Sequence, residues 1–190
     1  MKTVELLGAG MTFGTIPPFD PSAERWGTNK VMFARYGGVF NDWTRWFDVH
    51  PKEHIQRRRP DAWGWYMRQD GSRPIYLKEA DPDIPGSVAF PFEAVRTSFS
   101  TPTHDERDFW GSISWMLALA IVEGFERIDL FWFVLGNDQY SKQVPSTRYW
   151  IGQARARGID VRIHGDSALK PAPELYGVEA LSPPVEYVTA

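Results

Sequence analysis

The second half of the chain alternates between helical and extended patterns, and this alternation restricts the fold more than any other feature. Residues 108–124 (DFWGSISWMLALAIVEG) are apolar on nearly all sides, which predicts a buried helix that ends at Gly124. The segments that follow are an apolar strand at 127–136, a helix at 146–158 between Pro145 and Gly158, and a strand at 159–165. Strand–helix–strand units close through right-handed crossovers, so the sequence predicts a mainly parallel sheet in an α/β, Rossmann-like three-layer sandwich.

The first half supplies further strands and a broken helix. The predicted strands are residues 3–7, 24–33 (ending near Asn29), 44–51 and 73–80. Residues 52–68 are helical in pattern, but Pro60 must end or kink that helix. We expect an irregular connection at 81–95 and a polar loop at 98–109. A chain of 190 residues suits one domain, so we predict a nucleotide-binding domain at 1–170 and an extended tail at 171–190, which holds four of the 15 prolines.

Composition excludes several classes of function. The net charge of −3 gives no general affinity for nucleic acid. The absence of cysteine excludes disulfides, thiolate nucleophiles and cysteine metal sites. The longest apolar stretch, 113–125, is too short to span a bilayer and contains Glu123, and the N-terminus has no secretory leader pattern. We therefore expect a cytoplasmic protein without a membrane partner.

Five of the six predicted strands end in small, polar or titratable residues. In open α/β sheets, ligands bind beyond the carboxyl ends of the strands. The residues at these ends are Gly8–Thr12, Gly27–Asn29, Asp48–His50, Gly136–Asp138 and His164–Ser167. The pattern predicts a binding site at this edge of the sheet.

The first strand ends in a glycine-rich segment, GAGMTFG at 8–14. Its spacing misses the dinucleotide fingerprint by one residue, and Asn29 stands where an acidic ribose ligand is usual, so NAD, FAD and haem are not expected. Two interpretations remain. Backbone N–H groups of Gly8, Ala9, Gly10 and Met11, with the hydroxyl of Thr12, form a phosphate-binding nest, or the segment is a plain tight turn.

Asp48 and His50 are the strongest candidates for chemistry. They are two residues apart on a predicted strand and share one face, and a histidine beside a carboxylate can act as general base. Alternatively, His50 only caps the next helix. Asp138 is a second candidate catalytic carboxylate, and a Mg²⁺ ion held through nucleotide phosphates would need only Asp48 or Asp138. No other cluster predicts a metal site.

Polar side chains also gather after the fifth strand, in DQYSKQVPSTRYW at 138–150. Tyr140 is a candidate to stack on a base, Lys142 or Arg148 could balance phosphate charge, and Gln143 lies near the same strand end. The alternative for each of them is an ordinary surface position.

Five segments follow one another in an order that is similar to the order of motifs in a known family. They are LLGAGMT (6–12), WGTN (26–29), TRWFDVHP (44–51), GSISWMLALAIVEGFERIDLFWF (111–133) and STRYWIGQARARGIDV (146–161). Over residues 3–170 the chain resembles small Rossmann-like proteins of tailed phages and prophages. These are similar to MptE-like (6-hydroxymethylpterin diphosphokinase-like) proteins and to the fold of bacterial CMP-sialic-acid sialyltransferases. The resemblance implies a nucleotide bound across the glycine loop and the neighbouring strand ends.

The resemblance also implies roles for single residues. Gly8, Gly10, Met11 and Thr12 match its phosphate loop, and Asn29 matches an asparagine that the relatives place after strand two. Asp48 and His50 match the end of strand three, and Ser112 and Ser114 match a serine pair at the start of the buried helix. As a nucleotide-dependent transferase, the protein would use Asn29 to contact the ribose or the base. The chain departs from the pattern at its first loop, where the relatives often have Gly-Pro-Ser or Gly-Gly-Ser. It departs again after strand five, where LGNDQY replaces Gly-x-Asp.

Three functions follow as hypotheses. The first is a phage-type transferase that moves a glycosyl or diphosphoryl group from a nucleotide or nucleotide-sugar donor to a hydroxyl acceptor, in the host cytoplasm. The second is a non-catalytic module that sequesters a nucleotide signal. The third is hydrolysis of an N-glycosidic bond, with Asp48 or Asp138 working alone. A homo-oligomer is compatible with each of them.

Overall fold

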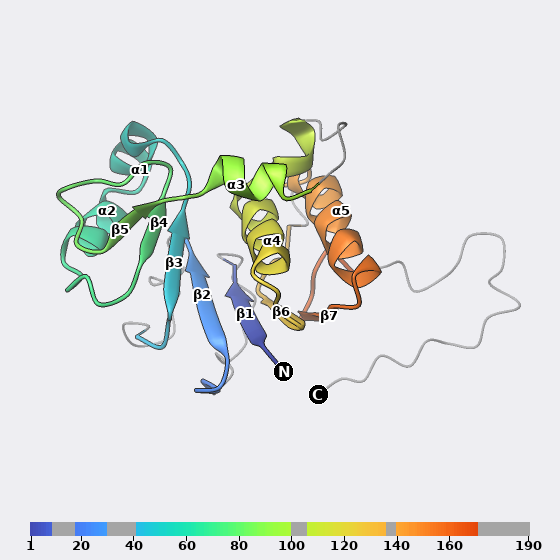
Figure 1. The fold of residues 1–190 in the computed structure, drawn as a ribbon. Coiled ribbons are helices and arrows are strands. Elements are labelled where there is room, and N and C mark those ends of the chain that lie inside the picture. The colour runs from blue at the N-terminus through green and yellow to red at the C-terminus, as the bar shows by residue number, and fades with distance from the viewer. Residues whose placement is uncertain (9–17, 30–40, 100–105, 136–139, 171–190) are drawn as a thin grey trace, which may run out of the picture.

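The computed structural model describes residues 1–8, 18–29, 41–99, 106–135 and 140–170 (Figure 1). Within these residues it contains one sheet of seven strands in the order β5-β4-β3-β2-β1-β6-β7, and every pairing is parallel. The strands are β1 Thr3–Leu7, β2 Glu24–Thr28, β3 Arg45–Asp48, β4 Ile75–Leu77, β5 Ser87–Ala89, β6 Arg127–Phe131 and β7 Asp160–His164. The predicted α/β class and parallel sheet are confirmed.

The strand order reverses at β1. Strands β2 to β5 are added on one side of β1, and β6 and β7 on the other (Figure 1). Such a reversal is a topological switch point, where the loops after two adjacent strands diverge and leave a crevice. The switch point lies between β1 and β6, which run side by side from the pairing of Thr3 with Arg127 to that of Leu7 with Phe131.

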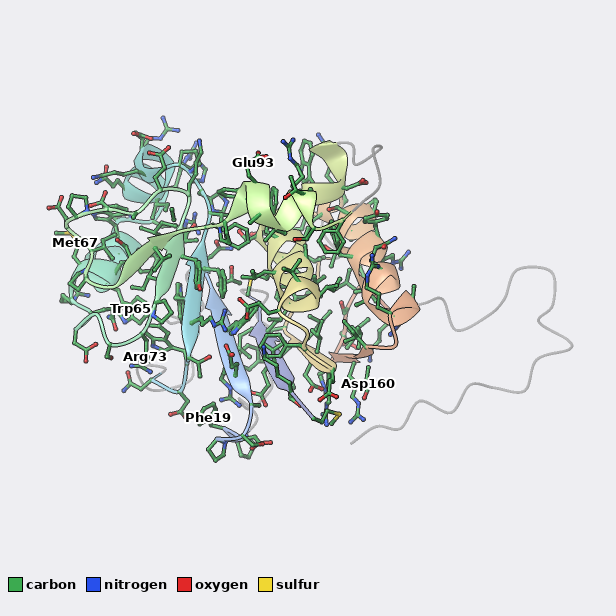
Figure 2. The ribbon with its side chains drawn as sticks, viewed as in Figure 1. Phe19, Trp65, Met67, Arg73, Glu93 and Asp160 are labelled. Atoms are coloured by element: carbon green, nitrogen blue, oxygen red, sulfur yellow. The ribbon has the colours of Figure 1, made fainter. Side chains whose placement is uncertain are left out.

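Helices cover both faces of the sheet, because successive side chains of each strand point to opposite faces. The helices are α1 Lys52–Arg58, α2 Pro60–Met67, α3 Phe92–Thr97, the short 3₁₀ helix η2 Glu106–Phe109, α4 Ser112–Val122 and α5 Gln143–Ala156. Phe47 belongs to a core shared with α3, α4 and α5, and its neighbour Trp46 belongs to a core shared with α1 and α2. In Figure 2 the labelled Trp65 lies on the α2 side, where it packs on Trp46. With helices on both faces of the sheet, the predicted three-layer arrangement is confirmed.

Several predicted boundaries are corrected. The helical segment 52–68 does break at Pro60, which becomes the first residue of α2. The expectation of an irregular 81–95 is wrong, because β5 and the start of α3 lie there. The strand predicted at 127–136 ends at Phe131, since Trp132 has a φ of 61°. The last predicted helix begins at Gln143 rather than 146. The predicted tail at 171–190 lies outside the described residues.

No helix in the described part of the chain is long and apolar enough to cross a membrane.

Candidate functional site

Because all strands run the same way, their carboxyl ends form one edge of the sheet, at the top of Figure 1. The register aligns Gly8, Thr28 and Phe47 on adjacent strands, since Leu7 pairs with Gly27 and Thr28 with Phe47. Neighbouring strands are about 4.8 Å apart, and Gly8 and Phe47 are separated by two such spacings, or about 10 Å. The structure therefore brings the start of the glycine segment to the edge that carries His50. Ala9, Gly10, Met11 and Thr12 lie outside the described residues.

Asp48 and His50 form a hydrogen-bonded pair at the end of β3. Nδ1 of His50 lies 2.7 Å from Oδ1 of Asp48, and the carboxylate is fully buried while the imidazole is 37 % exposed. With the ring proton on Nδ1 donated to the carboxylate, Nε2 keeps a lone pair and can accept a proton. This is the arrangement that a general base requires.

Two further donors hold the Asp48 carboxylate. Nη2 of Arg59 donates to Oδ1 at 3.1 Å, and the Tyr66 hydroxyl lies 2.9 Å from Oδ2. Burial, together with the charge and hydrogen bond of Asp48, raises the pKa of Tyr66 well above its usual range, so the hydroxyl stays protonated and donates. Both oxygens of Asp48 are therefore engaged, and its charge is balanced within the site.

The break between α1 and α2 places Arg59 in this cluster. Pro60 has no N–H and cannot continue α1, so the backbone of Arg59 leaves the helical region, with φ −143° and ψ 55°. Its own N–H still caps α1 by donating to the carbonyl of Ile55 at 2.8 Å. The sequence predicts this break, but it contains no local signal that points to Arg59 or Tyr66 as part of the site.

Asn29 follows β2 beside this cluster. Its φ of 52° is in the left-handed region, which asparagine tolerates better than most residues. Its carbonyl oxygen lies 3.0 Å from Nε1 of Trp46 and 3.0 Å from the Tyr66 hydroxyl. The side-chain Oδ1 is buried and has no hydrogen-bond partner among the described residues. An unpaired buried amide oxygen is unusual in a folded protein, and the predicted contact of Asn29 with ribose or base stays a prediction.

The switch point has a strained backbone. The N–H of Gly8 donates to the carbonyl of Phe131 at 2.8 Å, and a Cβ at Gly8 would lie 2.7 Å from the ring of Phe133. Only glycine fits this close approach. Trp132 (φ 61°) and Leu135 (φ 48°) adopt a conformation that is rare for bulky residues, and such strain concentrates at functional sites. Asp138 lies outside the described residues.

The two serines at the start of α4 differ. The hydroxyl of Ser112 is buried, and no described residue hydrogen-bonds to it. Ser114 is fully buried, and its Oγ lies 2.7 Å from Oγ of Ser146 on α5. This hydrogen bond joins α4 to α5, and the predicted role of Ser114 toward a ligand stays a prediction. Ser112 remains a candidate because its hydroxyl is unpaired at a helix N-terminus, where backbone N–H groups favour anions.

The candidate binding residues between 140 and 148 lie in different surroundings. The side chain of Gln143 lies against Gly111, directly before Ser112, which keeps it near the start of α4. Tyr140 is 38 % exposed. Nη2 of Arg148 donates to the carbonyls of Ala168 at 2.7 Å and Lys170 at 3.0 Å. Its guanidinium thus ties the segment after β7 to α5, which explains its position without a phosphate.

A second histidine–carboxylate pair, which the sequence did not predict, joins β6 to β7. Nε2 of His164, on β7, lies 2.7 Å from Oδ1 of Asp129 on β6, and the imidazole stacks on Phe131 with ring centroids 4.1 Å apart. Burial raises the pKa of Asp129, but hydrogen bonds from His164 and Arg127 lower it more, so the net change is downward. The sequence signal was a charged residue in the apolar run RIDLF, and the pairing of Phe131 with His164 explains the contact.

No group of three or more metal-ligating side chains occurs in the described ranges. The fit of Mg²⁺ to Asp48 is poor, because His50, Arg59 and Tyr66 already engage both carboxylate oxygens.

Comparison with known proteins supports the fold. No family model matches the chain, and no curated protein matches it by sequence. A solved structure that is similar is the sialyltransferase CstII from Campylobacter jejuni in complex with a substrate analogue, cytidine-5'-monophosphate. The two share 12 % identity with a TM-score of 0.51, over 86 % of this chain and 79 % of that chain. The expected likeness to the sialyltransferase fold is confirmed, and these comparisons give no support to the likeness to phage or MptE-like proteins.

Proposed function

We propose that the chain is a transferase that moves a glycosyl or diphosphoryl group from a nucleotide-activated donor to a hydroxyl acceptor. The observation that carries this proposal is the buried Asp48 carboxylate that holds His50 through Nδ1 at the carboxyl edge of the sheet. The likeness of the fold to a sialyltransferase crystallised with a cytidine nucleotide adds support.

The donor would bind at the switch point between β1 and β6. The nucleotide phosphate would face the first turn of α4, where Ser112 has an unpaired hydroxyl and the helix dipole favours an anion. The unpaired amide oxygen of Asn29 would accept a hydrogen bond from ribose or base. Strand β2 lies between β1 and β3, so His50 is at the same edge of the sheet, after a strand two positions from β1.

In the chemical step, the acceptor hydroxyl gives its proton to Nε2 of His50. The acceptor oxygen attacks the anomeric carbon, or the transferred phosphorus, and forms the new bond. The bond from that atom to the phosphate oxygen of the nucleotide breaks, and its electron pair leaves with the nucleotide. Asp48 stabilises the imidazolium that forms, and Arg59 and Tyr66 keep the carboxylate in place.

The other two hypotheses predict different behaviour. A nucleotide-sequestering module would bind but show no turnover, and His50 would then be only a structural group. Hydrolysis by Asp48 alone is disfavoured, because neither carboxylate oxygen is free to act as nucleophile or base. Asp138 remains the candidate carboxylate for that reaction.

The test compares His50→Ala with His164→Ala. The two histidines have the same 2.7 Å bond to a buried aspartate and the same 37 % exposure, so His164→Ala is a matched control. Binding of CMP, UMP, AMP and GMP is measured by calorimetry, and nucleotide release from CMP-, UDP- and GDP-sugars by chromatography. We expect His50→Ala to keep nucleotide affinity and to lose about 10²–10⁴-fold in turnover.

Four outcomes would contradict the proposal. Equal losses in both variants, or a loss only in His164→Ala, would show that His50 is not the base. Tight nucleotide binding without turnover of any sugar donor by the wild type would favour the sequestering module. Nucleotide release that never depends on an added acceptor would favour hydrolysis.

A further inference from the structure

A hollow of about 170 Å³ opens beside His50, on the side away from the switch point. It is lined by residues 50–53 and Ile55 at the start of α1, by Trp63 of α2, and by residues 77–81 after β4. We propose that this hollow is the acceptor subsite and takes a single uncharged sugar ring. The proposal rests on the proposed function, because it takes His50 as the base that deprotonates the acceptor.

The position of the hollow suits an acceptor. Strand β3, which ends at His50, lies between β4 on one side and β2 and β1 on the other. The hollow is on the β4 side, and the donor crevice is on the β1 side. Pockets for drug-sized ligands have volumes of about 300–1,000 Å³, so a hollow of 170 Å³ is too small for a nucleotide but suits one ring. His50 thus lies between the proposed donor site at the switch point and this hollow.

The lining combines an apolar floor with a polar rim. Ile55, Trp63 and Leu77 are buried and form the apolar part. Glu53 and Glu79 are exposed and can accept hydrogen bonds from hydroxyl groups. A sugar ring has both an apolar face and a rim of hydroxyl donors, so this lining matches it. An aliphatic acceptor would leave the carboxylates unused.

The charge of the hollow argues against an anionic acceptor. Lys52 is held by Asp81, with Nζ 2.5 Å from Oδ2, and its Nζ lies 5.2 Å from the centroid of the Trp63 ring. Two lysines and three carboxylates line the hollow, which leaves a formal charge of −1 with His50 neutral. A phosphorylated acceptor would meet net repulsion here, whereas a neutral hydroxylated ring would not.

The test fills the hollow without changing His50 or the donor crevice. Ala80 is an exposed lining residue, so Ala80→Trp places a large ring in the hollow. Ala156→Trp, at the exposed end of α5, makes the same change outside the hollow and is the matched control. Glu79→Gln is a milder second variant that keeps the shape and removes one carboxylate.

Two measurements apply to each variant. Saturation-transfer NMR with methyl β-galactopyranoside, methyl β-glucopyranoside and glucose 6-phosphate reports binding in the hollow without any turnover. Transfer kinetics with the best donor report the acceptor KM. We expect Ala80→Trp to abolish the methyl glycoside signal and to raise the acceptor KM about tenfold or more, with nucleotide affinity unchanged. Glu79→Gln should raise the same KM a few-fold, and Ala156→Trp should match the wild type.

The outcomes separate this proposal from the proposed function. Equal glycoside signals in Ala80→Trp and the wild type, no glycoside signal in the wild type, or stronger binding of glucose 6-phosphate would each overturn the acceptor subsite, whatever His50→Ala shows. A wild type without nucleotide binding would overturn the proposed function. The NMR comparison of Ala80→Trp with Ala156→Trp would then still decide whether the hollow binds sugar.

Discussion

Replacement of Gly27, on β2 directly before Thr28, tests how tightly β2 packs against Trp46 next to the candidate site. A Cβ added to Gly27 would lie 2.2 Å from Cζ3 and 2.4 Å from Cε3 of Trp46, which places it inside the ring's contact distance. Trp46 has no room to retreat, because it is fully buried and packs on Trp43 and Trp65 with ring centroids 5.6 and 4.8 Å away. We therefore expect Gly27→Ala to displace either the ring or the strand.

The size of the effect follows from two terms. Forcing one extra carbon into a close-packed core costs about 1–3 kcal/mol. A displaced Trp46 also loses the hydrogen bond from its Nε1 to the carbonyl of Asn29, which is worth about 1 kcal/mol. The free energy of unfolding should fall by about 3 kcal/mol in total, which lowers the melting temperature of a chain of this size by roughly 6–12 °C.

Urea unfolding followed by circular dichroism measures the loss, and Gly152→Ala provides the control. Gly152 lies on the exposed side of α5, and nothing lies within 4 Å of its added Cβ. Removing glycine from a helix there should stabilise the protein by about 0.5–1 kcal/mol, so the same chemical change should have opposite signs at the two positions. A Gly27→Ala variant as stable as the wild type would refute the packing argument.

Three more predictions test the groups at the edge of the sheet. Tyr66→Phe removes a donor to Asp48 and should lower the free energy of unfolding by about 1–3 kcal/mol in urea titrations, whereas an unchanged midpoint would contradict the buried network. Burial raises the pKa of Asp129 in the folded protein, but the hydrogen bonds from His164 and Arg127 lower it by more, so the net shift is downward. The ionised carboxylate therefore stabilises the fold fully at a pH above its unfolded pKa, near 3.9, and this contribution is lost as the pH falls through the folded pKa. Asp129→Asn should therefore flatten the decline of the melting temperature below about pH 4, and a decline as steep as in the wild type would count against the assignment. Gly8→Ala crowds the switch point and should weaken CMP binding about tenfold in calorimetry if the donor binds there, while wild-type affinity would move the donor site elsewhere.

The sequence predicted the sheet well because its strongest patterns were unambiguous. A helix that is apolar on nearly all sides, such as α4, can only lie inside the protein. The helix α5 between β6 and β7 forms a crossover connection, which is why those two strands are parallel. The pattern failed at β5 and α3. Strand β5 has three residues at the edge of the sheet, and Pro82, Pro85 and Pro91 around it are typical of loops. A strand this short has no periodicity to detect.

The candidate site was predictable only where its residues are close in sequence. The Asp48–His50 pair follows from a spacing of two on a strand, and its hydrogen bond is present. Asp129 and His164 are 35 residues apart and meet only through the register of β6 with β7. Ser114 was matched to a ligand site through the resemblance alone, and its hydrogen bond with Ser146, on another helix and 32 residues away, has no signal in the local sequence.

The geometry of His50 and the docking of α2 depend on the same carboxylate. Asp48 receives hydrogen bonds from His50 between β3 and α1, from Arg59 at the break between the helices, and from Tyr66 within α2. A fully buried carboxylate without these donors would cost several kcal/mol, so the sheet cannot bury Asp48 until α2 brings Arg59 and Tyr66 to it. Tyr66 also contacts the carbonyl of Asn29, which links the second strand to the same event. Packing of α2 against the sheet and orientation of the histidine are therefore coupled, and a substitution that loosens α2 should reduce the chemistry before it unfolds the protein.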